Sequence, residues 1–151
     1  MSAGSGPLSC TWGRDDLLRR LPHAPPALLL ESVECPAPGE RGTARAHFPS
    51  DHPVFRGHFP GRPVVPAWAL LEAAAQALGC VAFASEAAAR TAVLAEVARA
   101  RFLAPLGPDA RVELDVQIEK RWGEWIRGRV EAREGGRRVA EMELTLSTGA
   151  V

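Results

Sequence analysis

The pattern of hydrophobic and polar positions changes along the chain. An apolar, alanine-rich run over residues 66–85 has few polar side chains, which is typical of a helix enclosed by other structure. Over residues 110–121 the period shortens to two, which predicts a strand with one buried face. The apolar positions of this strand are Val112, Leu114, Val116 and Ile118. Further strands are expected over 91–102, 125–133 and 139–147, with a hairpin turn at 134–137.

Upstream of the long helix the elements are shorter. Residues 14–20 predict a short helix that ends before Pro22, and 27–34 and 43–48 predict two strands joined by a turn at 39–42. The order is therefore one short helix, two strands, a long helix and four strands. Strands that follow one another through hairpins form an antiparallel sheet, and one apolar helix needs a curved sheet to cover it. We expect a single α+β domain over residues 14–151, preceded by a flexible lead-in over residues 1–13.

The loop before the long helix carries the first candidate chemistry. Four prolines and two glycines within residues 53–66 exclude regular structure there and leave a stiff loop around His58. On the helix, Glu72 and Gln76 lie four residues apart and therefore share one face. Two interpretations remain open at this point. The two side chains form the polar stripe of a surface helix, or His58 and Glu72 form an acid/base pair where the loop meets the helix.

Composition narrows the function classes. The 18 basic residues balance the 18 acidic ones, so bulk electrostatics do not indicate nucleic acid as a partner. The three cysteines show no paired or metal-ligand spacing, which predicts inert free thiols in a reducing compartment, the cytoplasm. Glu72 within the apolar run disfavours a membrane span. A metal site is not expected, because no known ligand spacing matches the candidate set of His47, Asp51, His52 and His58. No cofactor is expected either.

The stretch GHFPGRPVVPAWALLEAAAQ, residues 57–76, resembles the signature of the bacterial β-hydroxyacyl-acyl-carrier-protein dehydratases of the FabZ/FabA type, which have a hot-dog fold. The similarity includes LPHAPPALLLESV upstream and GRRVAEMELTL downstream. It implies that His58 is the catalytic histidine and Glu72 the catalytic acid. Glutamate rather than aspartate at the acid position indicates the FabZ branch. The resemblance also implies a homodimer whose active sites combine the histidine of one subunit with the carboxylate of the other, and many members assemble into hexamers.

Dehydration of a 3-hydroxyacyl thioester needs a base for the C2 proton, an acid for the leaving hydroxyl and a donor for the thioester oxygen. Neutral His58 suits the first task, and protonated Glu72 suits the second if burial raises its pKa. The first free backbone N–H groups of the helix suit the third. Gln76 either orients Glu72 or bonds to a neighbouring strand. The residues expected to contact the substrate beside the acid/base pair are Phe59, Ala67, Trp68 and Gln76.

Some positions depart from the family pattern. Ala67 and Trp68 replace a glycine and a small aliphatic residue, Ala24 replaces an arginine, and the chain has no tyrosine for a tunnel gate. These differences suggest a specialised dehydratase that serves polyketide, aryl-polyene or other secondary lipid synthesis. The alternatives are a hot-dog acyl thioesterase and a catalytically silent hot-dog subunit that binds acyl carriers. An acidic acyl carrier protein would need a basic docking patch, for which the candidates are Arg99, Arg101, Arg121 and Arg127. For each arginine the alternative is a solvated strand face.

Overall fold

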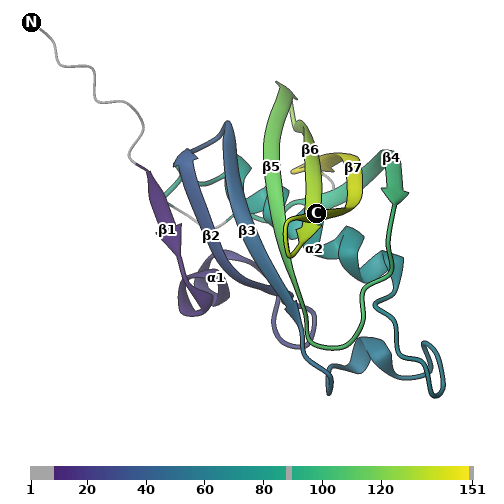
Figure 1. Cartoon of the computed structure of the whole chain (residues 1–151). Coiled ribbons are helices and arrows are strands. Elements are labelled where there is room, and N and C mark those ends of the chain that lie inside the picture. Colours follow the sequence, from purple (N-terminus) through teal and green to yellow (C-terminus); the bar gives the residue numbers. More distant parts are fainter. Residues whose placement is uncertain (1–8, 88–89, 150–151) are drawn as a thin grey trace, which may run out of the picture.

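The structure is a computed structural model, which describes residues 9–87 and 90–149. Seven strands form one antiparallel sheet in the order β1-β2-β3-β5-β6-β7-β4. The strands are β1 (Cys10–Trp12), β2 (Leu30–Ala37), β3 (Arg41–Phe48), β4 (Val93–Phe102), β5 (Ala110–Trp122), β6 (Trp125–Glu134) and β7 (Arg137–Ser147). The helices are α1 (Arg14–Arg20), the 3-10 turn η1 (Pro53–Phe55) and α2 (Ala67–Ala82). In Figure 1 the sheet curves around α2, with β1 at one edge and β4 at the other.

The long helix lies inside the curve of the sheet. α2 contacts β2, β3, β5, β6 and β7, and its residues from Ala73 to Leu78 are all buried. Two glycines let the strands come this close to the helix. A Cβ at Gly128 on β6 would collide with the side chain of Leu78, and one at Gly42 on β3 would lie 2.8 Å from Cγ2 of Val81. The contacts of α2 therefore form the centre of the hydrophobic core.

Most elements expected from the sequence are present. The short helix covers Arg14–Arg20 as predicted, and the long helix expected over residues 66–85 covers Ala67–Ala82. Along β5, Val112, Leu114 and Val116 are buried. The residues between them, on the other side of the strand, are exposed or half-buried. The α+β class, with one antiparallel sheet wrapped around a central helix, is thus confirmed.

The structure differs from the expectation at the N-terminal side. The lead-in expected over residues 1–13 contains strand β1 at Cys10–Trp12, which pairs with β2 and buries Trp12, whereas residues 1–8 lie outside the described part. The strand expected from residue 27 begins only at Leu30, because the N–H groups of Ala27 and Leu28 donate to the carbonyl of Ala24 and close a turn. The first difference comes from pairing with a strand distant in the sequence and the second from a local turn, and hydrophobic periodicity encodes neither.

The two edge strands of the sheet differ in how much other structure covers them. β1 has only three residues, and α1 packs beside it. β4 has ten residues, pairs only with β7, and exposes every residue except Ala100, which is half-buried. Its exposed apolar side chains are Val93, Leu94, Val97 and Phe102. β4 thus presents a long unpaired edge. Among the described residues, none of the helices has the length and apolar character needed to cross a membrane.

Candidate active site

His58 is held in the loop between β3 and α2, drawn in blue in Figure 1. Gly57 and Gly61 adopt φ values of +77° and +70°, a region that favours glycine, so both sit where the loop must turn. The backbone N–H of Val64 donates to the carbonyl of His58 at 2.8 Å, and Nδ1 of His58 lies 2.8 Å from the carbonyl oxygen of Val64. Because a carbonyl only accepts, Nδ1 carries the proton, and Nε2 of the neutral ring keeps its lone pair. The loop thus presents His58 as a base.

Phe59 and the start of α2 lie beside this histidine. The ring of Phe59 stacks on His58 with centroids 4.2 Å apart, and Phe59 remains 54% exposed. Pro66 is the N-cap of α2, and the first helical N–H groups that bond back to it are those of Ala69 and Leu70. Within the described chain, the backbone N–H groups of Ala67 and Trp68 therefore have no acceptor. They are available donors at the positive end of the helix.

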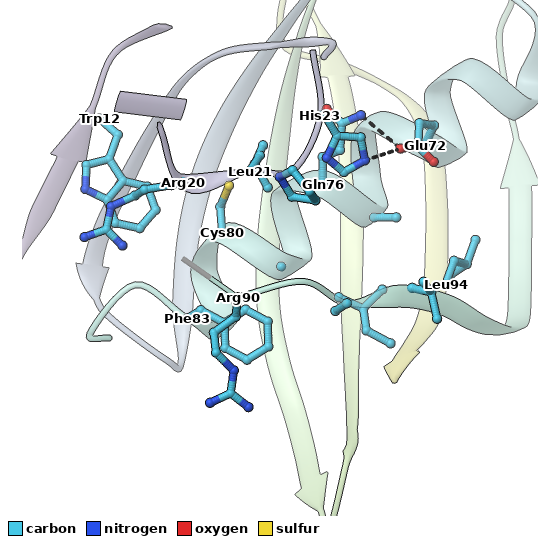
Figure 2. Close-up of a pocket in the computed structure, with 16 residues that line it drawn as sticks. Trp12, Arg20, Leu21, His23, Glu72, Gln76, Cys80, Phe83, Arg90 and Leu94 are labelled. Carbon is cyan, nitrogen blue, oxygen red and sulfur yellow. Dashed lines mark hydrogen bonds and ion pairs between the residues drawn. The ribbon is translucent and has the colours of Figure 1, made fainter. Parts of the chain in front are cut away.

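Glu72 lies one turn further along α2, and its side chain is half-buried. Its Oε1 accepts two hydrogen bonds, from Nε2 of Gln76 at 3.0 Å and from Nε2 of His23 at 3.0 Å (Figure 2). Gln76 is itself 2% exposed and fully used, since it also donates to the carbonyl of Ala27 and accepts from the N–H of Leu29. Gln76 contacts the carboxylate as the first alternative expects, while its backbone partners lie before β2 and not in a strand; its role in orienting Glu72 stays a prediction. Gln76 thus ties α2 to the segment before β2.

The protonation expected for Glu72 is not found in the single chain. The hydrogen bond from His23 lowers the pKa of Glu72, and Gln76 and the charge of His23 act in the same direction, while burial opposes them. Burial does raise this pKa, as expected from the sequence, but the donors outweigh it, so the expected net rise is wrong for the empty site. The reason is that the Glu72 side chain stays 38% exposed and has two donors. The lowered pKa favours the carboxylate form in the single chain.

His58 and Glu72 line the same groove. This groove has a volume of about 520 Å³ and runs between the loop before β2, the His58 loop and the first turns of α2. Trp68 also lines it and is 62% exposed. A second, smaller cavity of about 230 Å³ begins on the other side of Glu72 and extends along α2 to Phe83. Its wall includes His23, Gln76 and the start of β4 (Figure 2). Glu72 thus lies between two hollows.

The four arginines proposed for carrier docking do not form a free basic patch. Arg99 and Arg101 both pair with Glu141, at 3.3 and 3.5 Å, and Arg127 pairs with Glu96 at 3.0 Å. The guanidinium of Arg121 donates to the carbonyl of Ala82 at the end of α2. Their docking role stays a prediction, and these partners are the ones expected for the alternative, a solvated strand face.

The remaining candidates for chemistry have other surroundings. Cys35 and Cys80 are buried, and burial raises the pKa of the Cys80 thiol to about 12, which disfavours the reactive thiolate. In residues 9–87 and 90–149, no three His, Cys, Asp or Glu side chains are grouped closely enough to hold a metal ion. Of the metal candidates, His47 pairs instead with Glu31, and His52 caps η1 by accepting from the N–H of Val54.

His23 is the site residue that the sequence analysis missed. It lies in the turn after α1 and reaches Glu72, which is 49 positions away in the chain. A lone histidine in a proline-rich turn gives no sign of a partner so distant. The only available signal was that His23 stands within LPHAPP, a segment that already took part in the family resemblance.

Comparison with known proteins shows which family the chain belongs to. The FabA-like domain family matches residues 21–143, which include His23, His58 and Glu72. A protein of Enterococcus faecalis named 3-hydroxyacyl-[acyl-carrier-protein] dehydratase FabZ is 40% identical over 131 residues, which cover 85% of this chain and 92% of the relative. A FabZ of Myxococcus xanthus is 37% identical over 131 residues, covering 85% of this chain and 86% of that protein.

A solved structure shares the architecture. The TT0310 protein of Thermus thermophilus matches with a TM-score of 0.58 and 26% identity, over 80% of this chain and 92% of that one. The sheet wrapped around α2 is thus a hot-dog fold. Family match, relatives and fold agree along most of the chain. The chain therefore belongs to the FabA-like family, among its FabZ-type 3-hydroxyacyl-[acyl-carrier-protein] dehydratases.

Proposed function

We propose that this protein removes water from 3-hydroxyacyl thioesters carried on an acyl carrier protein and releases trans-2-enoyl thioesters. The observation that carries the proposal is the groove in which His58, with a free Nε2, and Glu72 line one space. Groups of these two types supply the base and the acid that the reaction needs. The resemblance implies that a homodimer combines the histidine of one subunit with the carboxylate of the other, and that pairing stays a prediction. The names of the relatives supply the substrate class.

In the proposed mechanism, Nε2 of His58 takes the proton from C2 of the acyl chain. The C3–O bond breaks, and the leaving hydroxide takes a proton from Glu72 to form water. Negative charge that builds on the thioester oxygen is stabilised by the free N–H groups of Ala67 and Trp68. The electron pair of the C2–H bond forms the C2=C3 double bond. After the reaction His58 gives up the proton it gained and Glu72 takes one up, so the net change is the loss of one water molecule.

This mechanism requires Glu72 to gain a proton that it lacks in the empty site. The side chain is 38% exposed in the single chain. An acyl chain in the groove would displace water from this carboxyl group, and loss of hydration disfavours the charged form. We propose that Glu72 becomes the acid only when the substrate fills the groove.

We also propose that the protein acts as a homodimer that pairs through β4. This strand has an unpaired edge, and Val93, Leu94, Val97 and Phe102 are exposed on it. A second copy would continue the sheet and cover these apolar side chains. The start of β4 also lines the smaller cavity beside Glu72, so a partner at this edge would lie next to the site. Val97→Asp is expected to convert a dimer into a monomer in light scattering, and an unchanged dimer would contradict the interface.

The direct test is an assay of the purified protein. 3-Hydroxyacyl carrier-protein thioesters of several lengths are incubated with the wild type, His58→Ala and Glu72→Gln, and the loss of water is followed by mass. We expect dehydration by the wild type and a loss of roughly 10²-fold or more in each variant, which is the usual contribution of general acid–base groups. Free acid as the product would indicate a thioesterase, and no turnover on any substrate would indicate a silent subunit.

A further inference from the structure

Glu72 uses only one of its two carboxyl oxygens within the described chain. Oε1 accepts from both His23 and Gln76, and Oε2 accepts from no residue that the structure describes. Because Glu72 also lines the groove that holds His58, the unused oxygen is the one left for a ligand there. The two donors come from different elements, one from α2 itself and one from the turn before β2.

The contact defines the tautomer of His23. A carboxylate only accepts, so Nε2 of His23 must carry a proton and donate it to Oε1. Nδ1 of the same ring is buried and has no hydrogen-bond partner among residues 9–87 and 90–149. A proton on Nδ1 would therefore create a buried N–H without an acceptor. The geometry therefore assigns the proton that faces Glu72 to Nε2.

The hydrogen bonds of His23 differ from those expected for a side chain with a purely structural role. Structural side chains in buried positions usually satisfy both polar ends, as Gln76 does with its three bonds. His23 leaves one nitrogen unsatisfied and directs the other at the carboxyl group of the groove. This pattern is typical of a side chain placed for the group that it contacts.

We propose that His23 is a positioning residue of the dehydratase site, which binds Oε1 of Glu72 and leaves Oε2 as the oxygen that gives its proton to the substrate hydroxyl. The inference rests on the proposed function. When Glu72 is protonated, the donor on Oε1 directs the proton to Oε2. When the proton leaves, the bond from Nε2 strengthens because its acceptor becomes charged. His23 thus stabilises the charge that develops on Glu72 during the reaction.

Other charged groups around the pair do not replace this contact. Arg56, His52 and His58 line the groove, and Arg20 and Arg90 line the smaller cavity. Among the described residues none of these five forms an ion pair with Glu72. The direction of the Glu72 pKa agrees, since His23 is its largest cause.

The test compares His23→Phe with His23→Gln, whose amide nitrogen can take the place of Nε2. In the substrate-free protein, the carboxyl carbon of Glu72 is titrated by ¹³C NMR and assigned with Glu72→Gln. We expect the pKa of Glu72 to rise in His23→Phe, because burial then acts without the donor, and to stay near the wild type in His23→Gln. On substrate, His23→Phe should lower kcat on the order of tenfold at unchanged KM, the factor expected for one lost bond to a charged group.

His47→Phe is the matched control, because it removes another His–Glu pair, with Glu31 at 3.2 Å, outside the groove. It should alter neither kcat nor the titration of Glu72. If His23→Phe does not fold, His23→Asn replaces it, since asparagine is too short to reach Oε1. An unchanged pKa of Glu72 in the folded variant, or equal loss of kcat in the His23 and His47 variants, would overturn the proposal. The titration needs no turnover, so failure of the proposed function appears separately, as an inactive wild type.

Discussion

The two halves of α2 differ although they belong to one continuous helix. In the first half, Ala67 and Trp68 are exposed and Leu71 and Glu72 are half-buried, and only the two residues 69 and 70 are buried. From Ala73 to Ala82 every residue is buried except Gly79, which is half-buried. The second half therefore holds the domain together, and the first half is left accessible for chemistry. The difference shows that function here occupies the incompletely covered end of a structural helix.

The cause of the difference lies in what covers each half. The strands press on the second half so closely that Gly128 has no room for a side chain beside Leu78, and the N–H of Gly39 donates to the carbonyl of Val81 at 2.9 Å. The first half faces the groove and the His58 loop instead. Substitutions can test whether stability and activity separate along the helix in this way.

The largest effect on stability is expected for Leu78→Ala in the covered half. Leu78 has no exposed surface and packs against β6 at Gly128. Loss of its side chain should lower the free energy of unfolding by about 2–5 kcal/mol, the usual range for a buried leucine. Urea unfolding measures this change, and kcat per folded molecule should stay at the wild-type value. A loss of kcat in the folded fraction would contradict the idea that the second half of α2 serves stability and not activity.

Gln76 lies near the boundary between the two halves of α2, so Gln76→Leu should lower both stability and activity. The change removes the acceptor of the buried Leu29 N–H and one donor to Glu72. An unsatisfied buried group costs about 1–3 kcal/mol, so the free energy of unfolding should fall by that amount. The same variant should also lower kcat, because Oε1 of Glu72 keeps only His23. Unfolding curves and steady-state kinetics on one preparation would show whether the two losses occur together.

A smaller effect is expected from acid. The folded-state pKa of Glu72 lies below the ordinary value of 4.5, so its contribution to stability is complete above that pH and is lost as the pH falls through the folded pKa. Glu72→Gln should therefore lose less stability than the wild type when the pH is lowered below 4.5. Unfolding free energies measured at several pH values give the comparison, and parallel curves would contradict it.

Trp68→Ala should have the smallest effect on stability. The side chain is 62% exposed at the open end, and such surface changes usually alter the free energy of unfolding by less than about 0.5 kcal/mol. Because Trp68 lines the groove, its removal should instead change the preference among acyl lengths. Competition between thioesters of two lengths measures this preference. If the variant keeps the wild-type selectivity for acyl length, the expectation that Trp68 contacts the substrate is wrong.

Much of the fold was predictable because its signals are local. The alternation of Val112, Leu114 and Val116 predicted a half-buried strand, and the alanine-rich run after Pro66 predicted the enclosed helix. Strand β1 was not predictable, since three residues are too few for a period. The exposure of β4 was not predicted, because the sequence indicates a strand there and not which of its faces other structure covers.

The candidate site was predictable only in part. His58 and Glu72 stood out because a histidine in a stiff loop and a carboxylate in an apolar helix are unusual. Their shared groove agrees with that selection. The contact of His23 with Glu72 depends on how a turn after α1 folds back on α2, and the direction of the Glu72 pKa depends on that contact. Neither follows from spacing along the chain.

The open edge of β4 also affects how easily a newly synthesised chain mispairs with other chains. The free edge of this ten-residue strand, with Val97 and Phe102 exposed, can add to any other free edge, including that of an unfolded neighbour. Charged side chains on the same strand, such as Glu96 and Arg99, make such mispairing less favourable. Rapid capture by a partner would complete this protection. By mass action, dilution would separate such a pair and leave the edge free again.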